Sequence, residues 1–112
     1  MTEDEPSAVF ENRRLLCAGL GVDITRTSMC RQVHGTTISR AKANGIESRK
    51  QYSEGDAVWT DRPREPLLVL SADCLPIALC RTTKSPAIAA VHAGWRGLLG
   101  GVVPSACDTL GG

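Results

Sequence analysis

The chain is poor in aromatic residues and lacks several patterns that would place it in a class at once. Phe, Tyr and Trp make up only 4% of its 112 residues, so small aliphatic side chains, each burying less area, must form the core. No stretch approaches the roughly 18–20 apolar residues of a membrane-spanning helix. The acidic start, residues 1–6, has neither the basic nor the apolar part of a signal peptide. We therefore expect a soluble cytoplasmic protein.

The chain also lacks an excess of charge and a cysteine framework. Lys and Arg number 13 against 12 Asp and Glu, a net charge of +1, whereas a nucleic-acid binder normally shows a marked basic excess. The five cysteines are odd in number, form no CxxC pair and have no secretory context. This pattern predicts buried thiols or one functional thiol rather than disulfides.

The first half of the chain predicts one helix followed by short extended pieces. Residues 6–20 have Pro6 in the first turn, glycines at the end and apolar residues at helical spacing, which predicts a helix with Cys17 on its buried face. Residues 28–34 and 36–40 are predicted as strand-like pieces bent at Gly35. Residues 42–56 are polar and weakly periodic, which indicates a surface loop.

The second half contains apolar runs separated by turn residues. A short strand is predicted at 58–60, a turn at 61–66, and buried strands at 67–71, 75–80 and 87–92, with a hairpin connection at 81–86. Residues 98–110 predict a helix that Gly100, Gly101 and Pro104 weaken. Strands buried on both faces need cover on two sides, and the chain offers one good helix. We therefore expect either self-association or a fold of which part is absent.

Three reactive side chains stand at the ends of apolar runs beside backbone-bending residues. They are His34 in QVHG, Cys74 in ADCLP and His92 in HAGWRG, and the chain has no other histidine. Strand ends beside tight turns are where sheets present functional groups. Two imidazoles and a thiolate are suitable zinc ligands, and three protein ligands leave a fourth position open, as in catalytic sites.

The spacing alone leaves three interpretations open. Forty residues separate His34 from Cys74 and 18 separate Cys74 from His92, which matches no short metal motif. The three residues are therefore a metal site, or unrelated to one another, or a metal-free Cys–His nucleophile pair. In the last case, Asp73 or Asp56 would orient the histidine.

Other polar residues carry weaker hypotheses. Arg96 is a candidate for binding a phosphate or carboxylate, with a structural ion pair as the alternative. Trp95 either packs on its turn or stacks on a planar ligand. Asp56 is interpreted as a turn residue, and Cys30, Cys80 and Cys107 as core residues.

Five motifs together resemble one known protein family. In chain order they are Glu11-Asn12-Arg13-Arg14, Gln32-Val33-His34-Gly35, Gly55-Asp56-Ala57, Ser71-Ala72-Asp73-Cys74-Leu75-Pro76 and His92-Ala93-Gly94-Trp95-Arg96-Gly97. The series resembles the family variously called multicopper polyphenol oxidoreductase (laccase), peptidoglycan editing factor and purine nucleoside phosphorylase. The resemblance runs from about residue 6 to the end.

The resemblance implies a fold, an activity and a cofactor. It implies an α/β fold, a layered mixed β-sheet with flanking helices, and a zinc centre held by His34, Cys74 and His92, which are then also the catalytic residues. The implied reaction is phosphorolysis of adenosine, inosine, guanosine and methylthioadenosine, with adenosine deamination. The implied partners are thus a purine nucleoside and phosphate, with neither nucleic acid nor membrane. Copper is less suited, because three ligands are too few for a multicopper cluster.

The same resemblance predicts that the chain is an incomplete copy of the fold. Family members are about twice as long, and we expect residues 1–112 to be a single partial domain truncated at both ends. Such a fragment would associate with itself or with a separately encoded remainder. The alternatives to a phosphorylase are a metal-free Cys–His hydrolase acting on peptidoglycan precursors and an inactive fragment.

Overall fold

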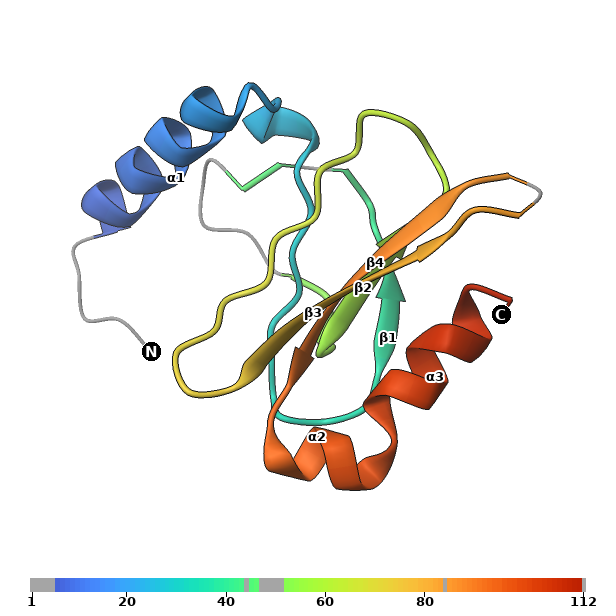
Figure 1. Cartoon of the computed structure of the whole chain (residues 1–112). Helices are drawn as coiled ribbons and strands as arrows, with labels where there is room; N and C mark the ends of the chain where they lie inside the picture. Colours follow the sequence, from blue (N-terminus) through green and yellow to red (C-terminus); the bar gives the residue numbers. More distant parts are fainter. Residues whose placement is uncertain (1–5, 44, 47–51, 84, 112) are drawn as a thin grey trace.

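A mixed sheet of four strands forms the centre of the computed structural model (Figure 1). The strands are β1 (Ile38–Arg40), β2 (Ala57–Thr60), β3 (Leu75–Arg81) and β4 (Ala87–Ala93), in the spatial order β1-β2-β4-β3. β1 is parallel to β2, and the other neighbours are antiparallel. The structure describes residues 6–43, 45–46, 52–83 and 85–111. The predicted layered α/β fold with a mixed sheet and flanking helices is confirmed.

The hairpin of β3 and β4 is the longest paired unit of the sheet. Its register runs from Leu75 opposite Ala93 to Arg81 opposite Ala87, so the predicted strands 75–80 and 87–92 and their hairpin connection are confirmed. The prediction that both strands are buried on two faces was wrong for β3. It lies at the edge of the sheet, and its residues alternate between exposed and half-buried, as in a sheet with one solvated face.

The N-terminal helix α1 (Pro6–Leu20) has the predicted bounds but little of the predicted packing. Cys17 is buried in a cluster with Met29 and Ile46. Leu16 and Leu20 stay 47% and 67% exposed. α1 lies beside the sheet rather than on it (Figure 1), and a single-turn 3-10 helix, η1 (Ile24–Arg26), follows. None of the helices in the described part of the chain is long and apolar enough to span a membrane.

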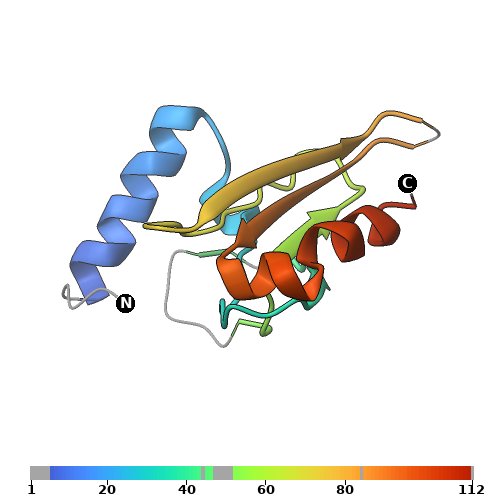
Figure 2. The same ribbon diagram turned by 60° about the horizontal axis from the view of Figure 1, so that its bottom comes forward.

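Two short helices cover one face of the sheet (Figure 2). They are α2 (Trp95–Gly100) and α3 (Val102–Thr109), and they replace the single helix predicted over 98–110. Gly101 has a φ of 91° and serves as the C-cap of α2 and the N-cap of α3. A left-handed residue ends a helix, and glycine adopts this conformation without a steric penalty. The helix pattern therefore breaks at this point.

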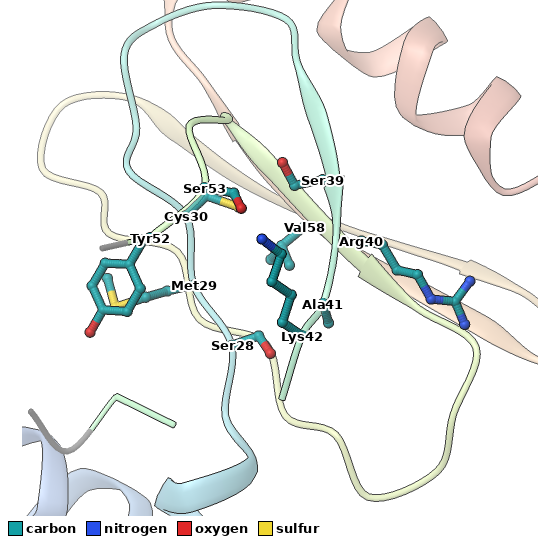
Figure 3. Close-up of a pocket in the computed structure, with 10 residues that line it drawn as sticks. All are labelled: Ser28, Met29, Cys30, Ser39, Arg40, Ala41, Lys42, Tyr52, Ser53 and Val58. Carbon is teal, nitrogen blue, oxygen red and sulfur yellow. The ribbon is translucent and has the colours of Figure 1, made fainter. Parts of the chain in front are cut away.

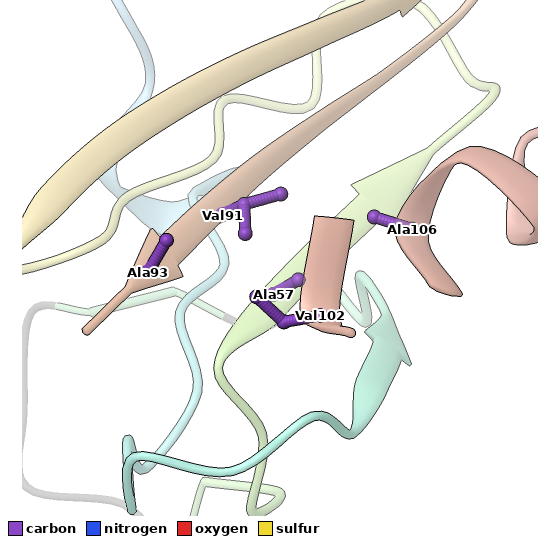
Figure 4. Close-up of a cluster of buried hydrophobic side chains, with 5 residues drawn as sticks. All are labelled: Ala57, Val91, Ala93, Val102 and Ala106. Atoms are coloured by element: carbon purple, nitrogen blue, oxygen red, sulfur yellow. The ribbon is translucent and has the colours of Figure 1, made fainter. Parts of the chain in front are cut away.

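The core consists of small side chains, as the scarcity of aromatic residues requires. On one face of the sheet, α3 packs on β2 and β4 through a cluster of valines and alanines (Figure 4): Ala57, Val91, Ala93, Val102 and Ala106. On the other face, Val58 packs with Cys30 and Ala41, against Leu67 and Val69. The central strands are thus covered by helices on one side and by extended chain on the other.

Two predicted strands were wrong. Residues 28–34 and 67–71 lie side by side, but they form only an isolated parallel bridge between Ser28 and Leu67. The N–H of Ser28 donates to the carbonyl of Pro66, and the N–H of Leu68 donates to the carbonyl of Ser28, both at 2.9 Å. Pairing extends no further as a ladder, and at the end of the first segment His34 has a φ of 61°, outside the extended conformation.

The predicted surface loop 42–56 also needs correction. Residues 44 and 47–51 lie outside the described part of the structure. Within the rest of the segment, Ile46 and Asp56 are both fully buried. Ile46 fills the space beneath α1, and the buried Asp56 lies beside the candidate site.

Candidate functional site

The structure brings His34, Cys74 and His92 together. Their ligand atoms, one from each residue, all lie within 4.8 Å of one another. The two imidazole rings pack edge to face, with centroids 5.1 Å apart and planes at 71°. In the described part of the chain, no other group of three or more His, Cys, Asp or Glu is arranged to hold a metal ion. The interpretation as three unrelated residues is therefore disfavoured by the geometry.

The three side chains differ in burial. His92 is 4% exposed, Cys74 is half-buried, and His34 is exposed. The group consequently has a buried end formed by His92 and a solvent-facing end formed by His34. The buried His92 side chain holds the group in place, and the exposed His34 side chain leaves it accessible to small molecules.

The β3–β4 register explains how Cys74 reaches His92. His92 lies opposite Pro76, and Leu75 lies opposite Ala93. Cys74 immediately precedes the first paired residue of β3, so its thiol lies beside Gly94 at the end of β4. A Cβ atom on Gly94 would stand 3.0 Å from Sγ of Cys74 and 3.3 Å from Cδ2 of His34. Glycine at this position allows the sulfur and the imidazole to approach the backbone closely.

Asp56 fixes the turn that carries His34. Its fully buried carboxylate accepts hydrogen bonds from the backbone N–H groups of Val33, His34 and Gly35 at 3.0, 2.9 and 2.9 Å. Successive N–H groups that converge on one anion form a nest. The interaction holds His34 in its left-handed conformation, which is unfavourable for a residue with a Cβ atom.

The same carboxylate orients His92. Oδ2 of Asp56 lies 2.7 Å from Nδ1 of His92. Burial would by itself raise the pKa of Asp56, but the hydrogen bonds from Gly35, His92, Val33 and His34 outweigh burial and lower the pKa below its usual value. An ionised carboxylate only accepts hydrogen bonds, so Nδ1 of His92 is the donor, and in a neutral imidazole Nε2 is then the nitrogen with a lone pair for a metal ion. Carboxylate–histidine pairs of this kind orient ligands in metal centres.

From the sequence, Asp56 was one of two residues that could orient a histidine in a metal-free site, and it was otherwise interpreted as a turn residue; its hold on the turn of His34 was not predicted. Its partners lie 21 to 23 residues before it and 36 residues after it. No local spacing relates such positions. Two signals were available: Asp56 lies in the Gly55-Asp56-Ala57 motif of the family resemblance, and it adjoins the apolar run of β2, which suggests an inward-facing carboxylate that needs partners.

The remaining candidates lie around the group rather than in it. Asp73 precedes Cys74, is exposed and is not a member of the cluster. Arg96 lies in the first turn of α2, with its guanidinium 5.3 Å from the ring centroid of Trp95. Trp95 is 68% exposed, which argues against the interpretation that it packs on its own turn. Both side chains follow His92 closely along the chain and remain accessible.

The other cysteines lie apart from the group. Cys30 lines a small hollow between β1 and the preceding segment, into which Lys42 points (Figure 3). Its thiol is 7% exposed and donates to the carbonyl of Ala57 at a sulfur–oxygen distance of 3.8 Å. Burial raises the pKa of Cys30. Cys30 is thus a core thiol, as predicted, whereas Cys80 is exposed and Cys107 half-buried.

The family described as multi-copper polyphenol oxidoreductase laccase matches residues 1–111. The chain belongs to this family. The chain is 38% identical to a purine nucleoside phosphorylase of Pseudomonas aeruginosa over 109 residues, which cover 97% of this chain and 41% of that protein. It is 41% identical to a purine nucleoside phosphorylase of Streptomyces coelicolor over 107 residues, covering 96% of this chain and 43% of the relative.

Solved structures of family proteins share the fold. The crystal structure of the hypothetical protein YfiH of Bacillus licheniformis superposes with a TM-score of 0.85 at 25% identity, covering 96% of this chain and 42% of that one. The Neisseria meningitidis protein NMB0706 gives a TM-score of 0.79 at 32% identity, covering 96% and 41%. The chain thus spans about two fifths of the length of the family members that it matches.

The family description names copper, but the described part of the chain brings together only three side chains that could bind a metal ion. A multicopper cluster requires many more ligands than three, with imidazole predominant, and the whole sequence holds two histidines. Two nitrogen donors and one thiolate fit a single zinc ion with one open position. The three side chains present therefore suit a single metal ion with one open position.

Proposed function

We propose that the chain carries the metal centre of a zinc-dependent purine nucleoside phosphorylase, with His34, Cys74 and His92 as ligands and catalytic residues. The convergence of these three side chains within 4.8 Å carries the proposal. The names of the curated relatives support the reaction class. The expected substrates are phosphate and adenosine, inosine, guanosine or methylthioadenosine, with adenosine deamination as a second reaction.

Zinc bound at this site would supply a Lewis acid next to the substrate oxygens. The residues of the chain prepare the site for it. Asp56 keeps the Nδ1 proton of His92 and directs Nε2 toward Cys74 and His34. The solvent-facing position of His34 leaves the outer side open for a nucleoside and a phosphate.

Arg96 is the residue proposed to contact phosphate. In phosphorolysis, a phosphate oxygen forms a bond to the ribose C1′ while the bond from C1′ to the purine nitrogen breaks. A guanidinium binds phosphate oxygens through two parallel hydrogen bonds. Arg96 is exposed and lies four residues after His92, in the first turn of α2. The exposed Trp95 ring beside it is suited to stack on a purine.

Metal analysis and a phosphorolysis assay test the proposal. Purified protein should contain about one zinc per chain, and Cys74→Ser should lose it, because a three-ligand site is weakened by removing its thiolate. Cys80→Ser is the matched control, since Cys80 is an exposed cysteine outside the group. Equal zinc content in Cys74→Ser and wild type would contradict the ligand assignment.

The activity belongs to the family proteins at their full length, of which this chain spans about two fifths. Release of hypoxanthine from inosine and phosphate should therefore be measured with the chain alone and with the family segments that it does not span supplied in trans. Activity in either case supports a phosphorylase. A zinc-loaded chain that is inactive in both would be a non-catalytic remnant.

A metal-free Cys–His hydrolase acting on peptidoglycan precursors is the second candidate. It is favoured by one observation, the hydrogen bond between Asp56 and His92, because an acid–histidine pair beside a thiol also describes a nucleophilic triad. Assaying the protein after treatment with a metal chelator distinguishes the hydrolase from the zinc-dependent phosphorylase. Hydrolysis that survives removal of all bound metal would support the triad and contradict the zinc centre.

A further inference from the structure

Gln32 forms a two-point contact with the backbone of a single distant residue. Its Nε2 donates to the carbonyl of Leu70, and its Oε1 accepts from the N–H of Leu70, both at 2.8 Å. A primary amide that both donates to and accepts from one residue reproduces the pairing between two strands. The side chain of Gln32 thus takes the place of a backbone partner where segments 28–34 and 67–71 fail to form a ladder.

The position of this contact relates two of the proposed metal ligands. Gln32 lies two residues before His34, and Leu70 lies four residues before Cys74, although 38 residues separate Gln32 from Leu70. The segment after Leu70 is closed by a further hydrogen bond, from the Ser71 hydroxyl to the carbonyl of Cys74. The turn that carries Cys74 is therefore connected through Leu70 to the turn that carries His34.

Asp56 does not supply this connection. The hydrogen bonds of Asp56 that the structure describes go to residues 33–35, to Thr37 and to His92. They position the two histidines relative to each other. Cys74 is half-buried and precedes its strand, so the distance between its thiol and His34 depends on how its turn is held.

We infer that Gln32 is a positioning residue for the metal centre, which holds the Cys74 thiol at its distance from His34. The inference rests on the proposed function, since it assumes that the three side chains bind a metal. Gln32 itself contacts neither a ligand atom nor substrate. Its effect reaches the metal through the backbone of Leu70 and the turn that follows.

Metal affinity and the stability of the metal-free protein distinguish a positioning role of Gln32 from a merely structural one. A neutral hydrogen bond at an accessible site contributes little to the net stability of a fold. Loss of a group that orients a metal ligand typically weakens metal affinity by about 10–100-fold. Zinc affinity measured on the folded protein therefore reports how the Cys74 thiol is positioned, whereas a merely structural role of Gln32 would lower only the stability of the metal-free protein.

Two variants and one control test the inference. Gln32→Met keeps the length of the side chain and removes both hydrogen bonds. Gln32→Glu keeps the acceptor for the Leu70 N–H and places a carboxylate against the Leu70 carbonyl. Arg31→Ala is the control, because Arg31 is the adjacent residue and its side chain makes only an exposed ion pair with Glu54 among the described interactions.

Zinc affinity is measured by competition with a chromophoric chelator, and the cobalt–thiolate charge-transfer absorption is measured at saturating cobalt. Gln32→Met should bind zinc about tenfold or more weakly and should show a weaker cobalt–thiolate band, because the thiol is no longer held in place. Gln32→Glu should fall between Gln32→Met and wild type. Arg31→Ala should match wild type in both measurements.

The possible results distinguish this inference from the proposed function. If wild type binds zinc and Gln32→Met matches it in affinity and in the cobalt band, the role of Gln32 is overturned while the metal centre stands. An equal loss in Arg31→Ala would also overturn it, since it would indicate general loosening. If wild type binds no zinc, both proposals fail. Should Gln32→Met not fold, Gln32→Glu decides by the same criteria.

Discussion

Asp56 and His92 contact each other twice. The carboxylate of Asp56 lies 2.7 Å from Nδ1 of His92, and the backbone carbonyl of Asp56 accepts from the His92 N–H at 2.7 Å. The two residues belong to neighbouring strands of the sheet or directly adjoin them. The orientation of the imidazole is thus fixed by the sheet itself, in a region where both residues are almost fully buried.

Replacing Asp56 should harm both the fold and the metal site. Asp56→Ala removes the acceptor of three partly buried N–H groups and of the buried imidazole Nδ1, and an unsatisfied buried donor costs about 1–3 kcal/mol. We expect a lower free energy of unfolding in urea and at least about a tenfold loss of zinc affinity.

Asp61→Ala is the matched control for Asp56. Asp61 pairs with Arg40 near the surface, where an ion pair contributes about 0–1 kcal/mol. This variant should retain zinc affinity and nearly all of its stability. If Asp56→Ala resembled it in both measurements, the central role of the buried carboxylate would be refuted.

A methyl group at Gly94 should block the site with little effect on the backbone. The residue has φ −83° and ψ 176°, which alanine adopts freely. The added Cβ would stand 3.0 Å from Sγ of Cys74 and 3.3 Å from His34. Gly94→Ala should therefore weaken zinc binding by displacing the sulfur, as measured by isothermal titration.

Gly19→Ala is the control for Gly94→Ala. Gly19 lies within α1 and a Cβ there meets nothing within 4 Å. Alanine in a helix is favoured over glycine by about 0.5–1 kcal/mol, so this variant should be slightly more stable, with unchanged zinc affinity. Full zinc affinity in Gly94→Ala would show that the site tolerates the methyl group.

Chelation should expose Cys74 to alkylation. A thiolate bound to metal is protected from iodoacetamide, so we expect the Cys74 peptide to be modified faster after zinc is removed. Cys30 should react slowly in both states, because burial raises the pKa of its thiol and the thiolate is the reactive form. Mass spectrometry of the separate peptides distinguishes these sites from the exposed Cys80. An unchanged rate at Cys74 would mean that no metal is bound to it.

Arg96→Ala should weaken phosphate use without removing zinc. A hydrogen bond to a charged group contributes about 1.5–3 kcal/mol. In an assay that includes the family segments outside this chain, the KM for phosphate should therefore rise by about tenfold or more. Arg96→Lys should recover part of this loss, because it keeps the charge but loses the two-point contact. A phosphate KM that is unchanged in Arg96→Ala would exclude this residue from the phosphate site.

Much of the fold was predictable where the signal is local. The bounds of α1 and the β3–β4 hairpin follow from periodicity and turn residues near them in the chain. Segments 28–34 and 67–71 have the apolar character of strands but not their pairing. Leu70 takes a glutamine side chain as its partner, and His34 adopts a left-handed conformation. Neither effect is visible in a hydrophobic pattern.

The site was predictable in part. His34, Cys74 and His92 follow from the motifs, and the structure brings the three side chains together. Gln32 was missed as a supporting residue, because its partner lies 38 residues away in the sequence. Asp56 was named only as one of two alternatives for orienting a histidine, because its partners lie 21 to 36 residues away. Only the folded chain shows which backbone groups a side chain of this kind satisfies.

The separation of the three ligands along the chain has a consequence for folding. A metal ion held by His34, Cys74 and His92 would close two loops, of 40 and 18 residues. Such a cross-link can form only where the folded chain has brought the three side chains together, so metal binding is coupled to folding. In a protein where the core cluster beneath α3 consists of alanine and valine alone, the bound ion would stabilise the fold as well as serve as a reactive centre. Binding should then raise the midpoint of thermal unfolding in proportion to the logarithm of free zinc.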